Sequence, residues 1–150
     1  MQLKIPPAIM MLFFGGIMWT INNFFDPWTL SVPGSSWLAL IFFVFAIIFG
    51  VKPLIQFAKK KTTIHPHTPD KASSLVSTGI YRLSRNPMYL ALLFLLISYG
   101  FYLDNLTTLL PLPFFVLYMN RYQIIPEEEA LTKRFGEEYK KYKSEVRRWL

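Results

Sequence analysis

Three groups of polar residues in this sequence carry side chains that could take part in chemistry. They are Ser77-Thr78-Gly79-Ile80-Tyr81-Arg82, then Arg85-Asn86-Pro87-Met88-Tyr89, and finally Asn120, Arg121, Gln123, Glu127 and Glu128. Long apolar stretches border these groups. Polar and ionisable groups at membrane depth cost free energy, and where they occur they usually serve a function. Together they form the candidate site.

Single members of this set also have simpler interpretations. Arg121 could hold an anionic acceptor or headgroup, or it could be an interfacial arginine whose guanidinium reaches water. Glu127 and Glu128 follow Pro126, a pattern typical of a solvated helix start, where the helix dipole favours acids. The functional interpretation therefore depends on the groups meeting in space.

Metal chemistry finds little support in the sequence. His65 and His67 flank a proline, with Asp70 nearby as a third possible ligand. Zinc needs at least three protein ligands in a workable geometry, and haem needs axial ligands from opposite faces. The chain has no cysteine and no P-loop, GxGxxG, GxSxG or HExxH motif. We predict no metal site and interpret the histidines as polar loop residues.

Long uncharged segments predict how the site is positioned. The 150 residues suffice for a single domain, 1–150, and 53% of them are hydrophobic. No charge occurs in 5–25 or 27–51, and Asp104 is the one charge between Arg85 and Arg121. Such segments can cross a hydrocarbon core of roughly 30 Å. We predict an all-α integral membrane protein with four transmembrane helices, at about 5–25, 36–57, 87–103 and 105–123.

The basic residues predict the orientation. All 16 Lys and Arg residues lie at the N-terminus, in the loop 58–87 and its edges, or from Arg121 onward. Basic residues mark the cytoplasmic side, so both termini should be cytoplasmic and the protein multi-pass, as in a prokaryotic inner membrane. The net charge of +7 then reflects cytoplasmic loops, and nucleic acid is not an expected partner. No obligate protein partner is inferred.

Local signals refine the cytoplasmic parts and the two shorter spans. Asn86-Pro87 predicts a helix start with Asn86 as the N-cap. Pro111 and Pro113 have two possible interpretations. They are ordinary transmembrane prolines, or they bend span four so that a lipid-facing groove opens. The tail 124–150 should form an amphipathic helix that lies on the membrane or closes over the loop. Its apolar stripe consists of Leu131, Phe135, Tyr139, Tyr142, Val146 and Trp149.

Two longer strings resemble a known family. They are Leu75-Val76-Ser77-Thr78-Gly79-Ile80-Tyr81-Arg82-Leu83-Ser84-Arg85-Asn86-Pro87-Met88-Tyr89 and Glu127-Glu128-x-x-Leu131-x-x-x-Phe135-Gly136-x-x-Tyr139-x-x-Tyr142. Both resemble the membrane methyltransferases related to isoprenylcysteine carboxyl methyltransferase and the phospholipid methyltransferases, in matching order and spacing. The resemblance covers roughly 58–150.

The resemblance implies a methyltransferase that takes cytosolic S-adenosylmethionine and releases S-adenosylhomocysteine. Its lipophilic acceptor would come from the membrane, either an isoprenylcysteine-like carboxylate or a lipid. Arg121 would bind this substrate, and no residue is assigned as catalytic. By position, the implied cofactor contacts are Ser73, Ser74, Leu75, Val76, Tyr81, Asn86, Pro87, Met88, Tyr89, Glu127 and Glu128.

Two departures leave the acceptor open. Asn86 stands where the eukaryotic prenylcysteine enzymes have histidine, and Gln123 stands at the spacing of the family's substrate-associated arginine. A phospholipid amine or a small thiol is an alternative acceptor. A membrane scaffold or transporter without enzymatic activity is the alternative from another class.

Overall fold

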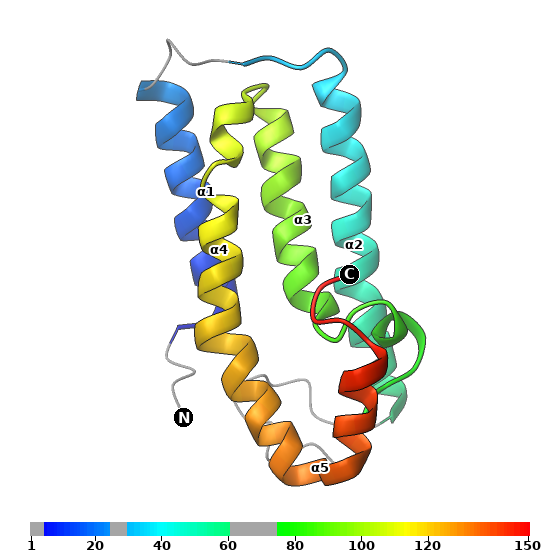
Figure 1. Cartoon of the computed structure of the whole chain (residues 1–150). Helices are drawn as coiled ribbons and strands as arrows, with labels where there is room; N and C mark the ends of the chain where they lie inside the picture. Colours follow the sequence, from blue (N-terminus) through cyan, green and yellow to red (C-terminus); the bar gives the residue numbers. More distant parts are fainter. Residues whose placement is uncertain (1–4, 25–29, 61–74) are drawn as a thin grey trace.

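The computed structural model describes residues 5–24, 30–60 and 75–150, and every regular element within these ranges is helical. The α-helices are α1 (Pro7–Phe24), α2 (Ser35–Lys60), α3 (Pro87–Tyr102), α4 (Leu112–Met119) and α5 (Ile125–Glu145). Three short segments join them: the 3-10 helices η3 (Gly79–Arg82) and η4 (Leu106–Leu109), and the π-helical η5 (Asn120–Ile124). Helices α1 to α4 run side by side, and α5 folds back beneath them (Figure 1). The predicted all-α class is confirmed.

Two helices in the described ranges are long and apolar enough to cross a membrane. They are α1, with 18 residues, and the 22-residue part of α2 at Ser35–Gln56. At a rise of 1.5 Å per residue, 18 residues cover roughly 27 Å, close to the hydrocarbon thickness. Helix α3 is apolar but has only 16 residues. Four crossings therefore stay a prediction.

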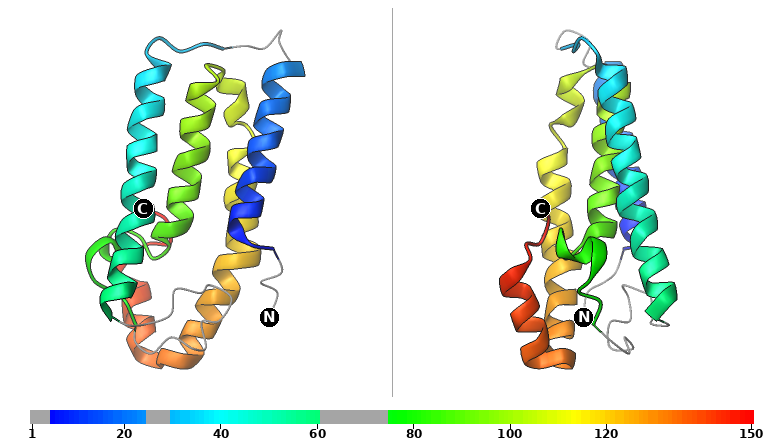
Figure 2. Two further views of the ribbon diagram at one scale, coloured as in Figure 1. Left: turned by 180° about the vertical axis from the view of Figure 1, so that it is seen from behind. Right: turned by 90° about the vertical axis from the view of Figure 1, so that its right-hand side faces the viewer.

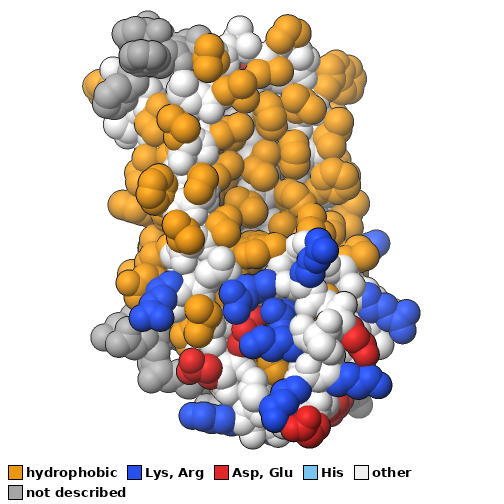
Figure 3. Space-filling view, viewed as in Figure 1, with side chains coloured by type: hydrophobic (Ala, Val, Ile, Leu, Met, Phe, Trp, Pro, Cys, Tyr) orange, Lys and Arg blue, Asp and Glu red, His pale blue; other side chains and the backbone are white. Residues whose placement is uncertain are grey.

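The surface divides into an apolar part and a charged end. Hydrophobic side chains cover the bundle of α1 to α4 on the face in Figure 3, while lysines, arginines and acids gather around α5. Large apolar side chains are strongly exposed on α2 and α4, with Trp37 at 72%, Phe114 at 65% and Leu117 at 62%. An apolar surface of this extent suits a lipid environment.

Helix α3 is fixed in the bundle by its contacts with α2. The ring of Phe94 lies 5.9 Å from that of Phe42 and 5.4 Å from that of Phe49, between centroids. The buried hydroxyl of Ser98 donates to the carbonyl of Ala39 at 2.8 Å, which satisfies a polar group inside the apolar layer. Helix α3 lies between α1 and α2 in the rear view of Figure 2. This packing holds the N-terminus of α3 at the charged end.

The predicted single helix over 105–123 is wrong. The segment begins with η4, where the Asn105 side chain accepts from the amide of Thr107 at 3.1 Å, and α4 starts only at Leu112. Pro111 and Pro113 have no N–H to donate, and proline is tolerated in the first turn of a helix but not inside it. The prolines therefore divide the span into a 3-10 turn and a short α-helix.

The predicted boundary near residue 123 is also replaced by a continuous helical path. The N–H of Ile125 donates to the carbonyl of Asn120, five residues earlier, which defines the π-helical η5. Pro126 follows directly and has no N–H, so the carbonyl of Tyr122 receives no regular α-helical bond from it. A π-bulge absorbs such a mismatch without ending the helix.

The C-terminal amphipathic helix is broken at Gly136. This glycine has φ 53° and ψ −123°, a conformation that L side chains rarely adopt. Beyond it, α5 turns back toward the bundle and ends at Glu145 (Figure 1). The six residues of the predicted stripe nevertheless all pack against one core cluster. The tail closes over the segment before α3, one of the two arrangements that the sequence predicts.

Candidate functional site

The predicted site residues meet where η3, the start of α3 and the first turn of α5 come together. The hydroxyl of Tyr89, on α3, donates to Oε2 of Glu127, on α5, at 3.1 Å. Tyr81, on η3, is buried, and its carbonyl accepts from the hydroxyl of Tyr142 at 2.7 Å. Val76 lies in the same buried cluster as Tyr81, and Leu75 packs against it. Residues 38 positions apart, Tyr89 and Glu127, are thus in direct contact.

Glu127 has an unusual electrostatic environment. Burial raises its pKa to about 7, the nearby charge of Glu128 acts in the same direction, and the hydrogen bond from Tyr89 opposes them. Burial and the charge of Glu127 raise the pKa of Tyr81, which keeps that phenol neutral. A partly buried carboxyl group whose pKa is raised to about 7 is a candidate ligand-binding group.

Glu128 lies in a cluster of ion pairs. Its carboxylate is 3.0 Å from Nη2 of Arg85 and 3.2 Å from Nζ of Lys143. Arg148 donates to both oxygens, from Nε at 2.8 Å and from Nη2 at 2.9 Å. Burial alone would raise the pKa of Glu128, but Arg148, Arg85 and Lys143 lower it. Since its oxygens already have partners, Glu128 holds the site together, and its contact with a cofactor stays a prediction.

Arg85 is a cation with unused hydrogen-bonding capacity. Its side chain is only 8% exposed and is paired through Nη2 with Glu128. In the described part of the chain, its Nε and Nη1 are buried and have no hydrogen-bond partner. Buried donors normally have hydrogen-bond partners, so the two unsatisfied nitrogens of Arg85 suggest a binding position for an anionic ligand.

The last five residues, 146–150, form a strap across the site, which we call the C-terminal strap. The carbonyl of Arg147 accepts from the amide of Arg85 at 3.0 Å. The carbonyl of Arg148 accepts from Asn86 Nδ2 at 2.9 Å and from Ser84 Oγ at 3.2 Å. The Nε1 of Trp149 donates to Oδ1 of Asn120 at 3.1 Å. The strap therefore connects the segment before α3 to η5.

The predicted helix start at Pro87 is confirmed, and Asn86 occupies the predicted N-cap position, but its side chain does not cap the helix. Asn86 has φ −127° and ψ 56°, and its side chain makes no capping hydrogen bond to α3. Its amide group donates to the strap instead. Pro87 is buried at the first position of α3, and Met88 beside it is partly buried.

Arg121 and Gln123 lie on η5 with opposite surroundings. Arg121 is exposed, and no ion pair is seen for it among the described residues. Gln123 is fully buried, and its Nε2 donates to the carbonyl of Ile5 at 2.7 Å. Its Oε1 has no partner in the described ranges. The structure therefore does not bring Arg121 into contact with Glu127 and Tyr89.

Several predicted residues lie outside the described ranges. These are Ser73 and Ser74 of the implied cofactor site, and His65, His67 and Asp70 of the loop. Among residues 5–24, 30–60 and 75–150, no group of three His, Cys, Asp or Glu side chains could hold a metal ion.

Comparisons with known proteins identify the family of this chain. The profile of the phospholipid methyltransferase family matches residues 35–138, more than half of the chain. A Haemophilus influenzae protein, described only as uncharacterized, is 44% identical over 63 residues, which are 42% of this chain and all of that protein. No solved structure matches the chain. The family match spans α2, η3, α3 and the acidic start of α5, so the chain belongs to the phospholipid methyltransferase family.

Proposed function

We propose that this protein is an S-adenosylmethionine-dependent methyltransferase that acts on a lipophilic acceptor from within the membrane. The observation that carries the proposal is the Tyr89–Glu127 pair, which joins the N-terminus of α3 to the start of α5 inside the region matched by a methyltransferase family. Arg85, which pairs with the adjacent Glu128, has two nitrogen donors, Nε and Nη1, without a partner among the described residues. These groups supply both the acceptors and the donors that the cofactor requires.

The acidic part of the site fits the ribose and the sulfonium end of the cofactor. A Glu127 carboxylate can accept hydrogen bonds from both ribose hydroxyls and attract a positively charged sulfur. Tyr81 and Tyr89 are buried aromatic residues in this region, and their rings suit an adenine face or a sulfonium methyl. All three residues were expected here from the family resemblance.

The basic part of the site fits the carboxylate of the methionine moiety. The N-terminus of α3, at Pro87, carries a partial positive charge and offers backbone N–H groups. The unpartnered Nε and Nη1 of Arg85, two residues earlier, can donate to the same carboxylate. We therefore add Arg85 to the cofactor-binding residues that the resemblance implies.

The protein's part in the reaction is alignment and the exclusion of water. When bound, S-adenosylmethionine would supply a methyl group on a sulfonium centre. The acceptor nucleophile would bond to the methyl carbon as the C–S bond breaks, and neutral S-adenosylhomocysteine would leave. Glu127, Tyr89 and Arg85 would fix the orientation of the donor, and the C-terminal strap would hold Arg85 and Asn86 in place. Orientation and desolvation can supply much of the rate enhancement without a general base.

The ionisation of Glu127 leads to a pH prediction. With a pKa raised to about 7, Glu127 is protonated in a growing fraction of molecules as the pH falls below 7. A ligand that hydrogen-bonds to the carboxylate should therefore bind more weakly, by at most about tenfold per pH unit. S-adenosylhomocysteine titrations between pH 5.5 and about 8 would measure this slope. The Glu127→Gln variant should lose it, and an unchanged slope would assign the titration to another group.

Fewer residues point to the acceptor than to the methyl donor. Arg121 is exposed on η5, six residues before Glu127, and could hold an anionic part of the acceptor. Arg121→Ala should then raise the acceptor KM or lower kcat by about tenfold while donor binding stays unchanged. Lysine at this position should restore activity only in part, because it lacks the planar guanidinium. Methyl transfer from labelled S-adenosylmethionine to membrane lipid extracts, followed by identification of the product, measures both the activity and this effect.

The assay also separates the competing interpretations. An interfacial anchor at Arg121 predicts lower thermal stability with normal kinetics in the folded fraction. The labelled product is a methyl ester, a methylated amine or a methyl thioether, and its chemical class identifies the acceptor as a carboxylate, an amine or a thiol. A protein that binds the donor but labels no lipid or thiol of its own membrane would contradict a lipophilic acceptor.

The proposed topology has four crossings and both termini in the cytoplasm. Single cysteines are best placed at exposed positions, Ser31 and Ser36 before and at the start of α2, and Ser144 near the end of α5. An impermeant thiol reagent added to intact cells should label the first two and spare the third, since basic residues remain inside. Labelling at Ser144 without permeabilisation would reverse the orientation.

A further inference from the structure

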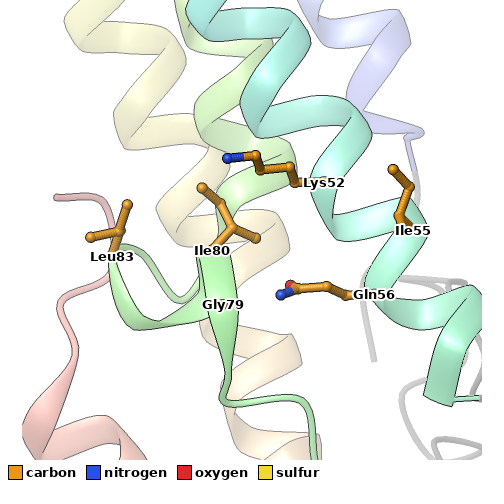
Figure 4. A pocket seen from close by; sticks show the side chains of 6 residues that line it. All are labelled: Lys52, Ile55, Gln56, Gly79, Ile80 and Leu83. Carbon is orange, nitrogen blue, oxygen red and sulfur yellow. The ribbon is translucent and has the colours of Figure 1, made fainter.

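A cavity of about 310 Å³ lies between the end of α2 and η3 (Figure 4). It is lined by Lys52, Ile55, Gln56, Gly79, Ile80 and Leu83. None of the residues of the proposed donor site is among them. The cavity therefore needs a separate explanation.

Gln56 gives the cavity a buried hydrogen-bond acceptor. Its Nε2 donates to the carbonyl of Thr78 at 3.2 Å, which fixes the orientation of the side-chain amide. Its Oε1 is buried and has no partner in the described part of the chain. Gly79, with φ +61°, allows this close approach, because a Cβ at that position would overlap the amide of Gln56. The turn and α2 are thus fitted to each other at this point.

Lys52 gives the cavity a positive charge. Its side chain and that of Gln56 both extend from α2 toward η3 (Figure 4). Ile55, Ile80 and Leu83 supply apolar walls, and among the described residues no acidic side chain lines the cavity. An occupant must therefore combine an anion with an apolar part and, for Gln56, a hydrogen-bond donor.

The position along α2 indicates where such an occupant would come from. No charged residue occurs between Pro27 and Val51, so Lys52 is the first charge after the apolar part of the helix. In a membrane this is the level of lipid headgroups, where lysine meets phosphates. We propose that this cavity binds the headgroup of an anionic phospholipid, with the phosphate at Lys52, a headgroup hydroxyl at Gln56 and the acyl chains along Ile55 and Leu83.

The site would belong to a lipid that is bound and not methylated, since the cavity lining does not include the donor site. Ile80 lines the cavity while its neighbour Tyr81 lies in the donor region, so a bound headgroup would also support the turn that carries Tyr81. The lipid site itself does not rest on methyl transfer and can be tested without it.

The test compares lipid retention in variants with the same change of charge. Full-length protein in detergent is titrated with phosphatidylglycerol or phosphatidylcholine, and bound lipid is measured by native mass spectrometry. Lys52→Gln should weaken phosphatidylglycerol binding by about fivefold, the contribution of one lysine near a membrane surface. Gln56→Ala should weaken it as well, whereas Lys141→Gln, on the exposed face of α5, should not.

Two outcomes would overturn the proposal. Equal weakening by Lys52→Gln and Lys141→Gln would show that general surface charge attracts the lipid. Displacement of the lipid by millimolar glycerol phosphate would assign the site to a soluble phosphate. Phosphatidylcholine should bind more weakly than phosphatidylglycerol to the wild type, and the difference between the two lipids should become smaller in Lys52→Gln.

Discussion

Replacing Glu128 by alanine should lower the free energy of unfolding by about 3 kcal/mol, because it leaves the buried guanidinium of Arg85 without its ion-pair partner. Both side chains are more than nine-tenths buried, at 7% and 8% exposure. Arg148 and Lys143 are more exposed and can turn toward water. The expected loss of stability is therefore at the lower end of the range for broken buried ion pairs. Denaturant unfolding of the purified protein measures this loss.

The chain supplies a matched control in the same helix. Glu137 and Lys140 form an ion pair at 2.6 Å, but their side chains are 87% and 60% exposed. Exposed pairs contribute little, so Glu137→Ala should leave stability nearly unchanged. A Glu128→Ala protein as stable as Glu137→Ala would mean that the ion-pair cluster does not hold the strap in place.

Replacing Glu127 by alanine should weaken binding of S-adenosylmethionine by about ten- to a hundredfold. The change removes an acceptor of charge-assisted hydrogen bonds, each worth about 1.5–3 kcal/mol. Tyr89 would lose its partner in the same variant. Isothermal titration calorimetry with the donor or with S-adenosylhomocysteine gives the affinity directly.

The neighbouring acid distinguishes a binding role from a general effect of charge. Glu129 is exposed on the same turn of α5, so Glu129→Ala removes the same charge from the same helix start. It should leave the affinity within about twofold of the wild type, since exposed charges are screened. Equal losses in both variants would assign the effect to the overall potential and not to a contact.

The sequence predicts the membrane-length helices and the start of α3 well. Uncharged stretches place α1 and α2 within a few residues, because a charge is costly in the hydrocarbon layer and ends the run. Asn86-Pro87 places the start of α3, because proline fits the first position of a helix and no interior one. These signals are local, because each depends on a single proline or on one uncharged stretch of residues.

The breaks in the last third of the chain could not be predicted from local patterns. Gly136 looks like an ordinary helix glycine in the sequence, and only its φ of 53° shows that the chain turns there. The π-helical η5 arises because the chain continues from α4 to Pro126 without a loop, and no local pattern shows that α4 and α5 are joined in this way. Pro111 and Pro113 indicated a bend, but not that the turn before them forms the 3-10 helix η4.

The candidate site, like the fold, has parts that the sequence predicts and parts that it does not. Motifs resembling the family identified Tyr81, Tyr89 and Glu127, which the structure brings together. Arg85 was part of the predicted polar groups but not of the implied cofactor contacts. The C-terminal strap was not predicted as part of the site, because Ser84 and Asn86, which donate to it, lie more than 60 residues earlier in the sequence. Trp149, the last member of the apolar stripe, was the one available signal that the C-terminus returns to the bundle.

We propose that Tyr89, Glu127 and Arg85 form a site for the methyl donor. Calorimetric titration of the wild-type protein with S-adenosylhomocysteine at pH 7.5–8, above the pKa of about 7 for Glu127, tests it most directly. We predict saturable binding of one molecule per chain, weakened in Glu127→Ala and retained in Glu129→Ala. Absence of binding to folded wild-type protein, or wild-type affinity in Glu127→Ala, would contradict the site.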